Sequence, residues 1–194
     1  MNRPTILDCA IAAMLAITSL TAAASGSNPA LPKQQLDAMS RLHHWSGTWQ
    51  GDGWAMTGPG QRQTFEITEQ VTKKLGGTVV LVEGRGTSTA PDGTEIVTHE
   101  ALGVVYYDTA SGGYNFQTHD RRGRANEVEL EIDEDGIMRW AFRDDHSGSL
   151  LRFEIEISGD TWHETGQVSP DGGDNWYPML EMTLKRQQAG TRTE

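Results

Sequence analysis

The sequence predicts an all-β protein, an antiparallel up-and-down barrel of about ten strands preceded by one short helix. From Trp49 to Arg186, runs of alternating apolar and polar residues end in Gly, Asp, Asn or Ser, and the next run begins without a helix-length spacer. Many short, evenly spaced strands are typical of a sandwich or a closed barrel. Because one face of the alternation is charged and the other apolar, we expect a solvated outside and an apolar inside, with closure removing the exposed edges.

The helix is expected over residues 34–44, where Leu36, Met39 and Leu42 recur at three-residue spacing and could lie across a barrel mouth. The strands that follow are each bounded by turn residues, with Gly76-Gly77 and Asp92-Gly93 as the strongest turn signals. In chain order they are Gly47–Met56, Gln63–Lys73, Thr78–Gly84, Glu95–Tyr107, Tyr114–His119, Glu127–Ile132, Ile137–Arg143, Leu151–Ile157, Thr161–Val168 and Tyr177–Arg186.

The first 24 residues are typical of a secretory signal peptide, which predicts a periplasmic or secreted protein. Arg3 precedes the apolar run Ala10–Leu20, and the small residues Ala22 and Ala24 form a cleavage site. The apolar run is shorter than the roughly 20 residues needed to span a bilayer. The single cysteine, Cys9, lies before the apolar core, so we expect no lipid on it and no thiol or disulfide in the mature chain.

The mature chain is expected to form one domain. Residues 25–33 are small, polar and proline-containing and are expected to be a flexible tail, residues 34–186 the barrel, and residues 187–194 a disordered C-terminus. The net charge of −11 argues against nucleic acid and anionic membrane surfaces as partners, because both would repel the protein. The expected partner is a small apolar or amphipathic molecule.

The first expected strand begins with Gly47-Thr48-Trp49, a short helix precedes it, and the last strand ends in Lys185-Arg186. This arrangement resembles the calycin group of lipocalins and fatty-acid-binding proteins. The resemblance implies that Arg186 covers the Trp49 ring in a structural cation–π contact that closes the barrel floor. The domain also resembles a secreted bacterial domain-of-unknown-function family, numbered 1579, through Gly47-x-Trp49-x-Gly51, Gly76-Gly77 and the segment Ser169–Trp176. That family implies a barrel and no agreed activity.

The segment Ser169–Trp176 fits S-x-D-x-G-x-x-W, the Asp-box hairpin of sialidase propellers. In such a turn Asp171 accepts hydrogen bonds from turn amides, Gly173 takes a positive φ and Trp176 packs against the hairpin. Propellers repeat the box in each blade, whereas this chain has one copy. We therefore interpret these three residues as structural.

No cofactor or metal is expected. Nitrobindins, which share a similar Gly-x-Trp-x-Gly strand, ligate haem iron through a late histidine, but the last strand here has none. The latest histidine, His163, should face solvent if Trp162 faces inward. None of the six histidines pair at a spacing suited to a metal, and the Asp-rich turns do not fit a calcium loop.

Counting by twos along each strand places several polar and aromatic residues on the inner face. Glu69 follows Phe65 and Ile67 in the alternation of its strand. His99 shares a face with Val97 and Tyr107, and Trp162 shares one with Glu164. A buried carboxylate near a histidine could bind a polar ligand head or act as a base with a raised pKa. The alternative is a structural role, in which the glutamate is hydrogen-bonded to its neighbours. One bulge in a strand would also turn any of these side chains outward. The ligand-facing candidates are Glu69, His99, Tyr107, Trp140, Trp162 and Glu164.

An apolar interior with a few polar groups is what small-ligand sites look like, so the sequence favours a barrel that binds a small, mainly apolar molecule. An enzyme of isomerase or cyclase type, driven by Glu69 or His99, is one alternative. A structural or interaction barrel filled by its own aromatic side chains is the other.

Overall fold

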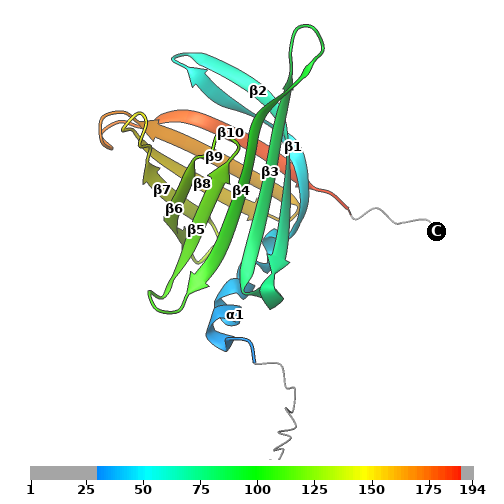
Figure 1. Cartoon of the computed structure of the whole chain (residues 1–194), viewed down its shortest axis with the longest axis vertical. Coiled ribbons are helices and arrows are strands. Elements are labelled where there is room, and N and C mark those ends of the chain that lie inside the picture. The colour runs from blue at the N-terminus through cyan, green and yellow to red at the C-terminus, as the bar shows by residue number, and fades with distance from the viewer. Residues whose placement is uncertain (1–29, 189–194) are drawn as a thin grey trace, which may run out of the picture. The chain divides into compact units, whose positions relative to one another are not determined.

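The computed structural model describes residues 30–188 and forms a closed barrel of ten strands (Figure 1). Each strand pairs antiparallel with its neighbours in the chain, and β1 closes the barrel against β10. The predicted all-β, up-and-down fold is confirmed. The predicted signal peptide, most of the predicted tail and residues 189–194 of the predicted C-terminal segment lie outside the described residues. The strands are β1 (Gly47–Gly58), β2 (Gln61–Lys74), β3 (Val79–Thr89), β4 (Glu95–Asp108), β5 (Gly113–Asp120), β6 (Ala125–Ile132), β7 (Met138–Arg143), β8 (Leu150–Ser158), β9 (Thr161–Ser169) and β10 (Tyr177–Arg186).

The helical segment is divided into two short helices, where the sequence predicted one. The α-helix α1 covers Lys33–Ser40, and the 3₁₀ helix η1 covers His43–Trp45. Met39, Leu42 and Trp45 recur every three residues, which is the period of a 3₁₀ helix, and all three are buried. The tighter winding keeps them on one face. Within the described part of the chain, no helix is long and apolar enough to cross a membrane.

Helix α1 covers one end of the barrel, which we call the closed end (Figure 1). The Tyr114 hydroxyl of β5 donates to the Ala38 carbonyl at 2.7 Å, and Nη2 of Arg41 donates to the Asp133 carbonyl after β6 at 2.5 Å. These contacts fix the helix from two neighbouring strands. At the opposite, open end lie the hairpins that join β1 to β2 and β3 to β4.

The contact between β1 and β10 depends on glycine. A Cβ atom at Gly51 would lie 2.1 Å from the Thr183 carbonyl oxygen, closer than any side chain tolerates. The two strands pair over seven residues, from Trp49 opposite Arg186 to Ala55 opposite Leu180. The barrel therefore closes where the first strand carries no side chain, and a larger residue at Gly51 would push β10 away.

A bulge in β4 separates Val97 from the inner face. The register skips Thr98, because Gly86 pairs with His99 and the next residue, Thr87, pairs with Val97. Thr87 also lies opposite the exposed Glu66, so Val97 belongs to the outer face. Counting by twos across Thr98 was wrong for Val97, while His99 keeps the inner face.

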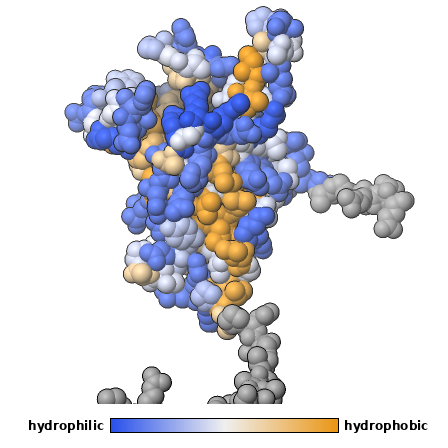
Figure 2. Space-filling view, in the orientation of Figure 1, coloured by the Kyte–Doolittle hydropathy of each residue, from blue (hydrophilic) through white to orange (hydrophobic). Residues whose placement is uncertain are grey.

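The outer surface is mostly hydrophilic, with one apolar band on the face that carries β4 (Figure 2). The outer-face residues Leu81 and Val104 pair across β3 and β4. Leu102 lies near them and is 36% exposed, and Leu75, in the short 3₁₀ helix η2 (Leu75–Gly77), is 73% exposed. The alternation expected from the sequence therefore has one apolar exception on the outside.

The turn before β10 is built around Asp171. Its Oδ2 accepts the Asn175 side-chain amide at 2.7 Å, and its Oδ1 accepts the Asn175 backbone N–H at 2.9 Å and the Ser169 hydroxyl at 2.7 Å. These bonds, the side-chain amide of Asn175 first, lower the pKa of Asp171 to about 2. Gly173 has φ = +110°, a backbone conformation that is strained for any residue other than glycine. The Trp176 ring lies 4.0 Å from the guanidinium carbon of Arg152 on β8. The turn is held by its own polar groups.

Arg186 ties the last strand to the closed end. Its guanidinium carbon lies 4.0 Å from the Trp49 ring centroid. The same guanidinium donates to the Ser46 carbonyl and, at 2.5 Å, to the His44 carbonyl, and it pairs with Asp160 at 3.1 Å. The Arg186 side chain thus covers one face of the Trp49 ring and donates hydrogen bonds to two carbonyl groups of the η1 turn.

We predict that Arg186→Ala lowers the free energy of unfolding by about 2 kcal/mol, because it removes a cation–π contact and charge-assisted hydrogen bonds. Urea unfolding followed by tryptophan fluorescence measures this. Lys185→Ala is the matched control: it removes a neighbouring exposed cation that bonds only Thr161 and should change stability by less than about 0.5 kcal/mol. Equal losses in the two variants would show that the Trp49–Arg186 contact contributes nothing specific.

Candidate ligand-binding site

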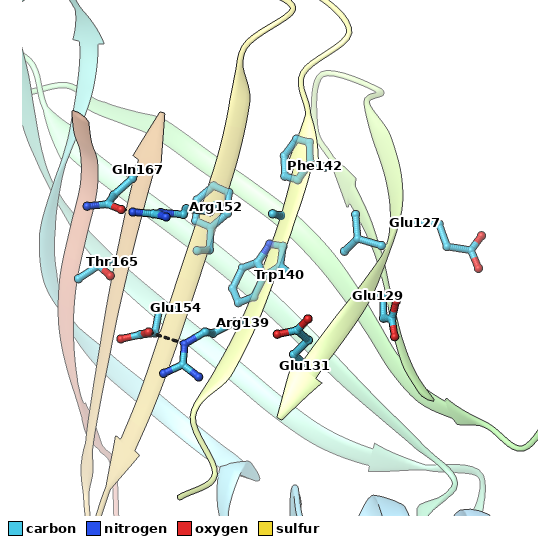
Figure 3. Close-up of a pocket in the computed structure, with 13 residues that line it drawn as sticks. Glu127, Glu129, Glu131, Arg139, Trp140, Phe142, Arg152, Glu154, Thr165 and Gln167 are labelled. Carbon is cyan, nitrogen blue, oxygen red and sulfur yellow. Dashed lines mark hydrogen bonds and ion pairs between the residues drawn. The ribbon is translucent and has the colours of Figure 1, made fainter. Parts of the chain in front are cut away.

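The barrel wall opens between β6 and β7. These strands pair at only two positions, Glu131 with Arg139 and Ile132 with Met138, both beside the turn that joins them. Beyond that point lies a pocket of about 870 Å³ (Figure 3). Residues of both faces line it, so the outer surface and the inner face meet there. We call it the wall opening; its lining is Glu127, Val128, Glu129, Glu131, Arg139, Trp140, Ala141, Phe142, Arg152, Phe153, Glu154, Thr165 and Gln167.

Aromatic side chains form the apolar side of the wall opening. The Trp140 ring stacks on Phe153 at 5.2 Å between centroids and meets Phe116 edge-on at the same distance, while Phe142 stacks on Phe153 at 6.1 Å. These four residues, which we call the aromatic wall, come from β5, β7 and β8. A surface of this kind binds flat or compact apolar groups.

Charged residues surround the wall opening, and its cations are already paired. Arg139 donates to Asp133 at 2.7 Å and to Glu154 at 2.6 Å. Arg152 donates to Gln167 at 2.7 Å and lies against Trp176. Three glutamates on the outer face of β6 add negative charge: Glu127, Glu129 and Glu131. The rim therefore disfavours an anionic ligand.

Three tryptophans fill the closed end. The Trp162 ring lies 5.3 Å from Trp45 and 5.8 Å, edge-on, from Trp49. The Trp49 indole N–H donates to the Trp45 carbonyl at 2.9 Å, and no ring is more than 2% exposed. We call Trp45, Trp49 and Trp162 the tryptophan cluster. The Trp45 indole N–H is buried and has no acceptor among the described residues.

Two glutamates lie on the inner face beside the tryptophan cluster. Glu69 of β2 pairs with Trp49, and Glu164 of β9 lies two residues after Trp162. They are 6% and 8% exposed. Glu164 accepts the Trp162 indole N–H at 3.2 Å, whereas no residue in the described range donates to Glu69. Gly84 makes room for the Glu69 carboxyl, since a Cβ atom there would lie 2.5 Å from its Oε1.

Burial keeps both carboxyl groups uncharged at neutral pH. It raises the pKa of Glu69 to about 8, with a further contribution from the negative charge of Glu164. Burial also raises the pKa of Glu164 to about 8, although the hydrogen bond from Trp162 opposes the change. Such groups can donate a hydrogen bond as acids, or accept one after losing a proton.

The sequence-predicted candidates occupy separate regions. Glu69, Trp162 and Glu164 come together at the closed end, and Trp140 lines the wall opening. His99 is exposed on the inner face toward the open end, and Tyr107 meets Tyr114 edge-on at 5.1 Å, close to α1. Outside the barrel, His163 pairs with Glu181 at 3.3 Å. No group of His, Cys, Asp and Glu within the described range is arranged to hold a metal.

Sequence reasoning missed most of the wall opening. Phe116, Phe142 and Phe153 share the inner face with Trp140, and their alternation was a readable signal for that face. The polar rim carried no such signal, because most outer residues of β7 and β8 are polar and nothing in the sequence distinguishes Arg139 and Arg152 from the rest. The opening itself follows from the short β6–β7 pairing, which the alternation does not encode.

Comparisons with known proteins support the fold. No family model and no curated protein matches the chain. Among solved structures, Rv2717c from M. tuberculosis is 16% identical with a TM-score of 0.54, covering 82% of this chain and 100% of its own. The S-type phycobiliprotein lyase CPES from Guillardia theta is 12% identical with a TM-score of 0.55, covering 79% of this chain and 92% of its own. These similarities fit a calycin-like barrel and establish the fold alone.

The two buried glutamates predict how stability depends on pH. Because their folded pKa lies near 8 and their unfolded pKa near 4.5, they hold protons in the folded state that the unfolded chain releases. Their stabilising contribution is complete below pH 4.5 and is lost as the pH rises to about 8. Each group contributes a slope of up to about 1.4 kcal/mol per pH unit in that window.

We therefore expect the melting temperature, measured by circular dichroism, to fall from pH 5 to pH 8. Glu69→Gln should reduce the slope, since glutamine does not titrate. Glu66→Gln removes an exposed glutamate from the outer face of the same strand and should leave the slope unchanged. A melting temperature that is flat over this range would contradict the raised pKa values.

Proposed function

We propose that this protein binds a small, mainly apolar molecule in its barrel, and that the molecule reaches the interior through the wall opening. The observation that carries the proposal is the pocket of about 870 Å³, in which the aromatic wall meets a polar rim. Small-molecule sites have volumes of roughly 300–1,000 Å³ and combine apolar walls with a few polar groups. A flat or compact apolar ligand fits the stacked rings best.

The exposure of the aromatic residues favours a binding barrel over one filled by its own side chains. Trp49 and Trp162 at the closed end are 0% and 1% exposed. Trp140, Phe142 and Phe153 belong to the same inner face but are only half-buried. Side chains therefore fill one end of the barrel and leave an apolar surface uncovered at the wall opening. A ligand would cover that surface.

An enzyme that acts in the same interior is the second candidate. Glu69 and Glu164 have pKa values raised to about 8, close to neutral pH, where a general acid works best. One structural neighbour is named a lyase, which supports chemistry in a barrel of this shape without assigning it to this chain. Conversion of a bound compound, detected by mass spectrometry and lost in Glu69→Gln, would favour the enzyme.

Binding is tested with N-phenyl-1-naphthylamine, an uncharged fluorescent probe at neutral pH. We expect saturable binding to the folded protein with quenching of tryptophan emission. Trp140→Ala should weaken binding about tenfold, because it removes the central ring of the aromatic wall. Fluorescence titration measures both effects.

Trp54→Ala is the matched control, since Trp54 lies on the outer face beneath Arg62 and donates to Glu181. It removes one indole without touching the wall opening and should leave the affinity unchanged. Absence of saturable binding to the native state would favour a side-chain-filled barrel. Equal weakening by the two variants would exclude the wall opening as the site.

We further propose that the protein is exported to the periplasm or beyond and belongs to the secreted family 1579 that its motifs resemble. The basic start, apolar run and Ala22–Ala24 site of the sequence support export. N-terminal sequencing of protein recovered from its own host should begin at or near Ser25. Protein that retains Cys9, with or without a lipid, would contradict cleavage at this site.

A further inference from the structure

We propose that the closed end of the barrel holds a subsite for the ammonium group of an amphipathic amine, with Glu69 and Glu164 as its acceptors. The inference rests on the proposed function and names its ligand class: a small apolar body that carries one basic nitrogen. The body would occupy the apolar interior, and the nitrogen would face the two glutamates.

Glu69 is a buried acceptor without a donor. Its side chain points into the barrel from β2, is 94% removed from solvent, and receives no hydrogen bond from the residues that the structure describes. Because α1 and the tryptophan cluster cover the closed end, its small exposed fraction faces the interior. Buried polar side chains are nearly always hydrogen-bonded, so an unpartnered carboxyl is the mark of a group that meets a ligand or solvent.

Glu164 adds a second acceptor close to the first. It enters the barrel from β9, and its negative charge is felt by Glu69. Its one hydrogen bond, from the Trp162 indole at 3.2 Å, uses one of the roughly four acceptor positions of a carboxylate. An ammonium group has three N–H donors. One carboxylate, together with the carbonyl oxygen of the neighbouring carboxylic acid, matches that requirement.

The surroundings favour a cation over other head groups. An anionic head group would be buried with no cation to pair with it, and either glutamate would repel it once its proton is lost. A neutral hydroxyl group has only one O–H to donate. The rings of the tryptophan cluster lie beside the glutamates, and indole rings attract cations through their faces. The net charge of −11 also draws cations toward the protein.

No protein cation competes for this position. Of the other titratable groups at this end, Tyr107 and Tyr114 contact each other, and His43, His44 and Lys73 are exposed. Arg186 is committed to Trp49, Asp160 and the carbonyls of His44 and Ser46. Arg41 donates to the carbonyl of Asp133. The two glutamates therefore have no basic partner among the described residues.

Binding should release a proton, which gives a direct readout. Without ligand, both carboxyl groups hold their protons at pH 7. An alkylammonium ion arrives already charged and forms an ion pair only with a carboxylate. One glutamic acid then gives its proton to the buffer, and the ammonium–carboxylate pair stays in the barrel. An uncharged ligand would bind without this release.

The experiment is isothermal titration calorimetry of three probes of equal chain length, octylammonium, 1-octanol and octanoate, at pH 7 in phosphate and in Tris. We expect octylammonium to bind about tenfold more tightly than 1-octanol, and octanoate to bind more weakly than either. The heat of octylammonium binding should differ between the buffers by an amount that corresponds to about one released proton. The heat of 1-octanol binding should not differ.

Two variants locate the effect. Glu69→Gln should abolish both the preference for the amine and most of the proton release, while leaving the affinity for 1-octanol within about twofold, because glutamine keeps the shape. Glu66→Gln removes the same charge from the outer face of β2 and should keep the preference and the proton release.

Three results would overturn the subsite. These are equal affinities for octylammonium and 1-octanol, buffer-independent heats, or the same loss in Glu66→Gln as in Glu69→Gln. If 1-octanol binds without an amine preference, the subsite is wrong and the proposed function stands. If none of the three probes binds while N-phenyl-1-naphthylamine does, the subsite is wrong and the proposed function stands. If N-phenyl-1-naphthylamine does not bind either, both are wrong.

Discussion

The seal at the closed end is the constraint on which the rest of this structure depends. Helix α1 and η1 bring Met39, Leu42 and Trp45 over the barrel floor, where Trp45 and Trp49 pack around Trp162. Arg186 then joins the last strand to the η1 turn through Trp49 and two carbonyl groups. Without this seal, water would reach the floor and the glutamates above it would be ordinary solvated acids.

Sealing one end changes the chemistry of the interior. Glu69 and Glu164 face a space from which water is largely excluded, so burial holds their carboxyl groups in the uncharged form. The wall opening between β6 and β7 leaves Trp140, Phe142 and Phe153 half-buried at the same time. The barrel thus combines two buried carboxyl groups at the closed end with an apolar surface at the wall opening. An amphipathic ligand has the same two parts.

The sequence predicted those features that depend on neighbouring residues. Alternation along β2 was enough to place Glu69 inward, because Phe65, Ile67 and Val71 share its face. Features that depend on distant pairing were not readable: the polar–apolar alternation of β6 continues unbroken where its pairing with β7 stops, and the bulge at Thr98 leaves no mark in composition. The three-residue spacing before Trp45 suits an α-helix and a 3₁₀ helix alike, so only the packing of Trp45 decided between them.

The central claim, that a sealed end keeps two glutamates uncharged at neutral pH, is tested most directly by NMR titration of the side-chain carboxyl carbons in ¹³C-labelled protein. Glu69→Gln and Glu164→Gln assign the two signals. The account predicts that both carboxyl groups keep the chemical shift of the protonated form at pH 6.5, about two pH units above the usual pKa of a glutamate side chain. Titration of all glutamate carboxyl groups below pH 6 would contradict it.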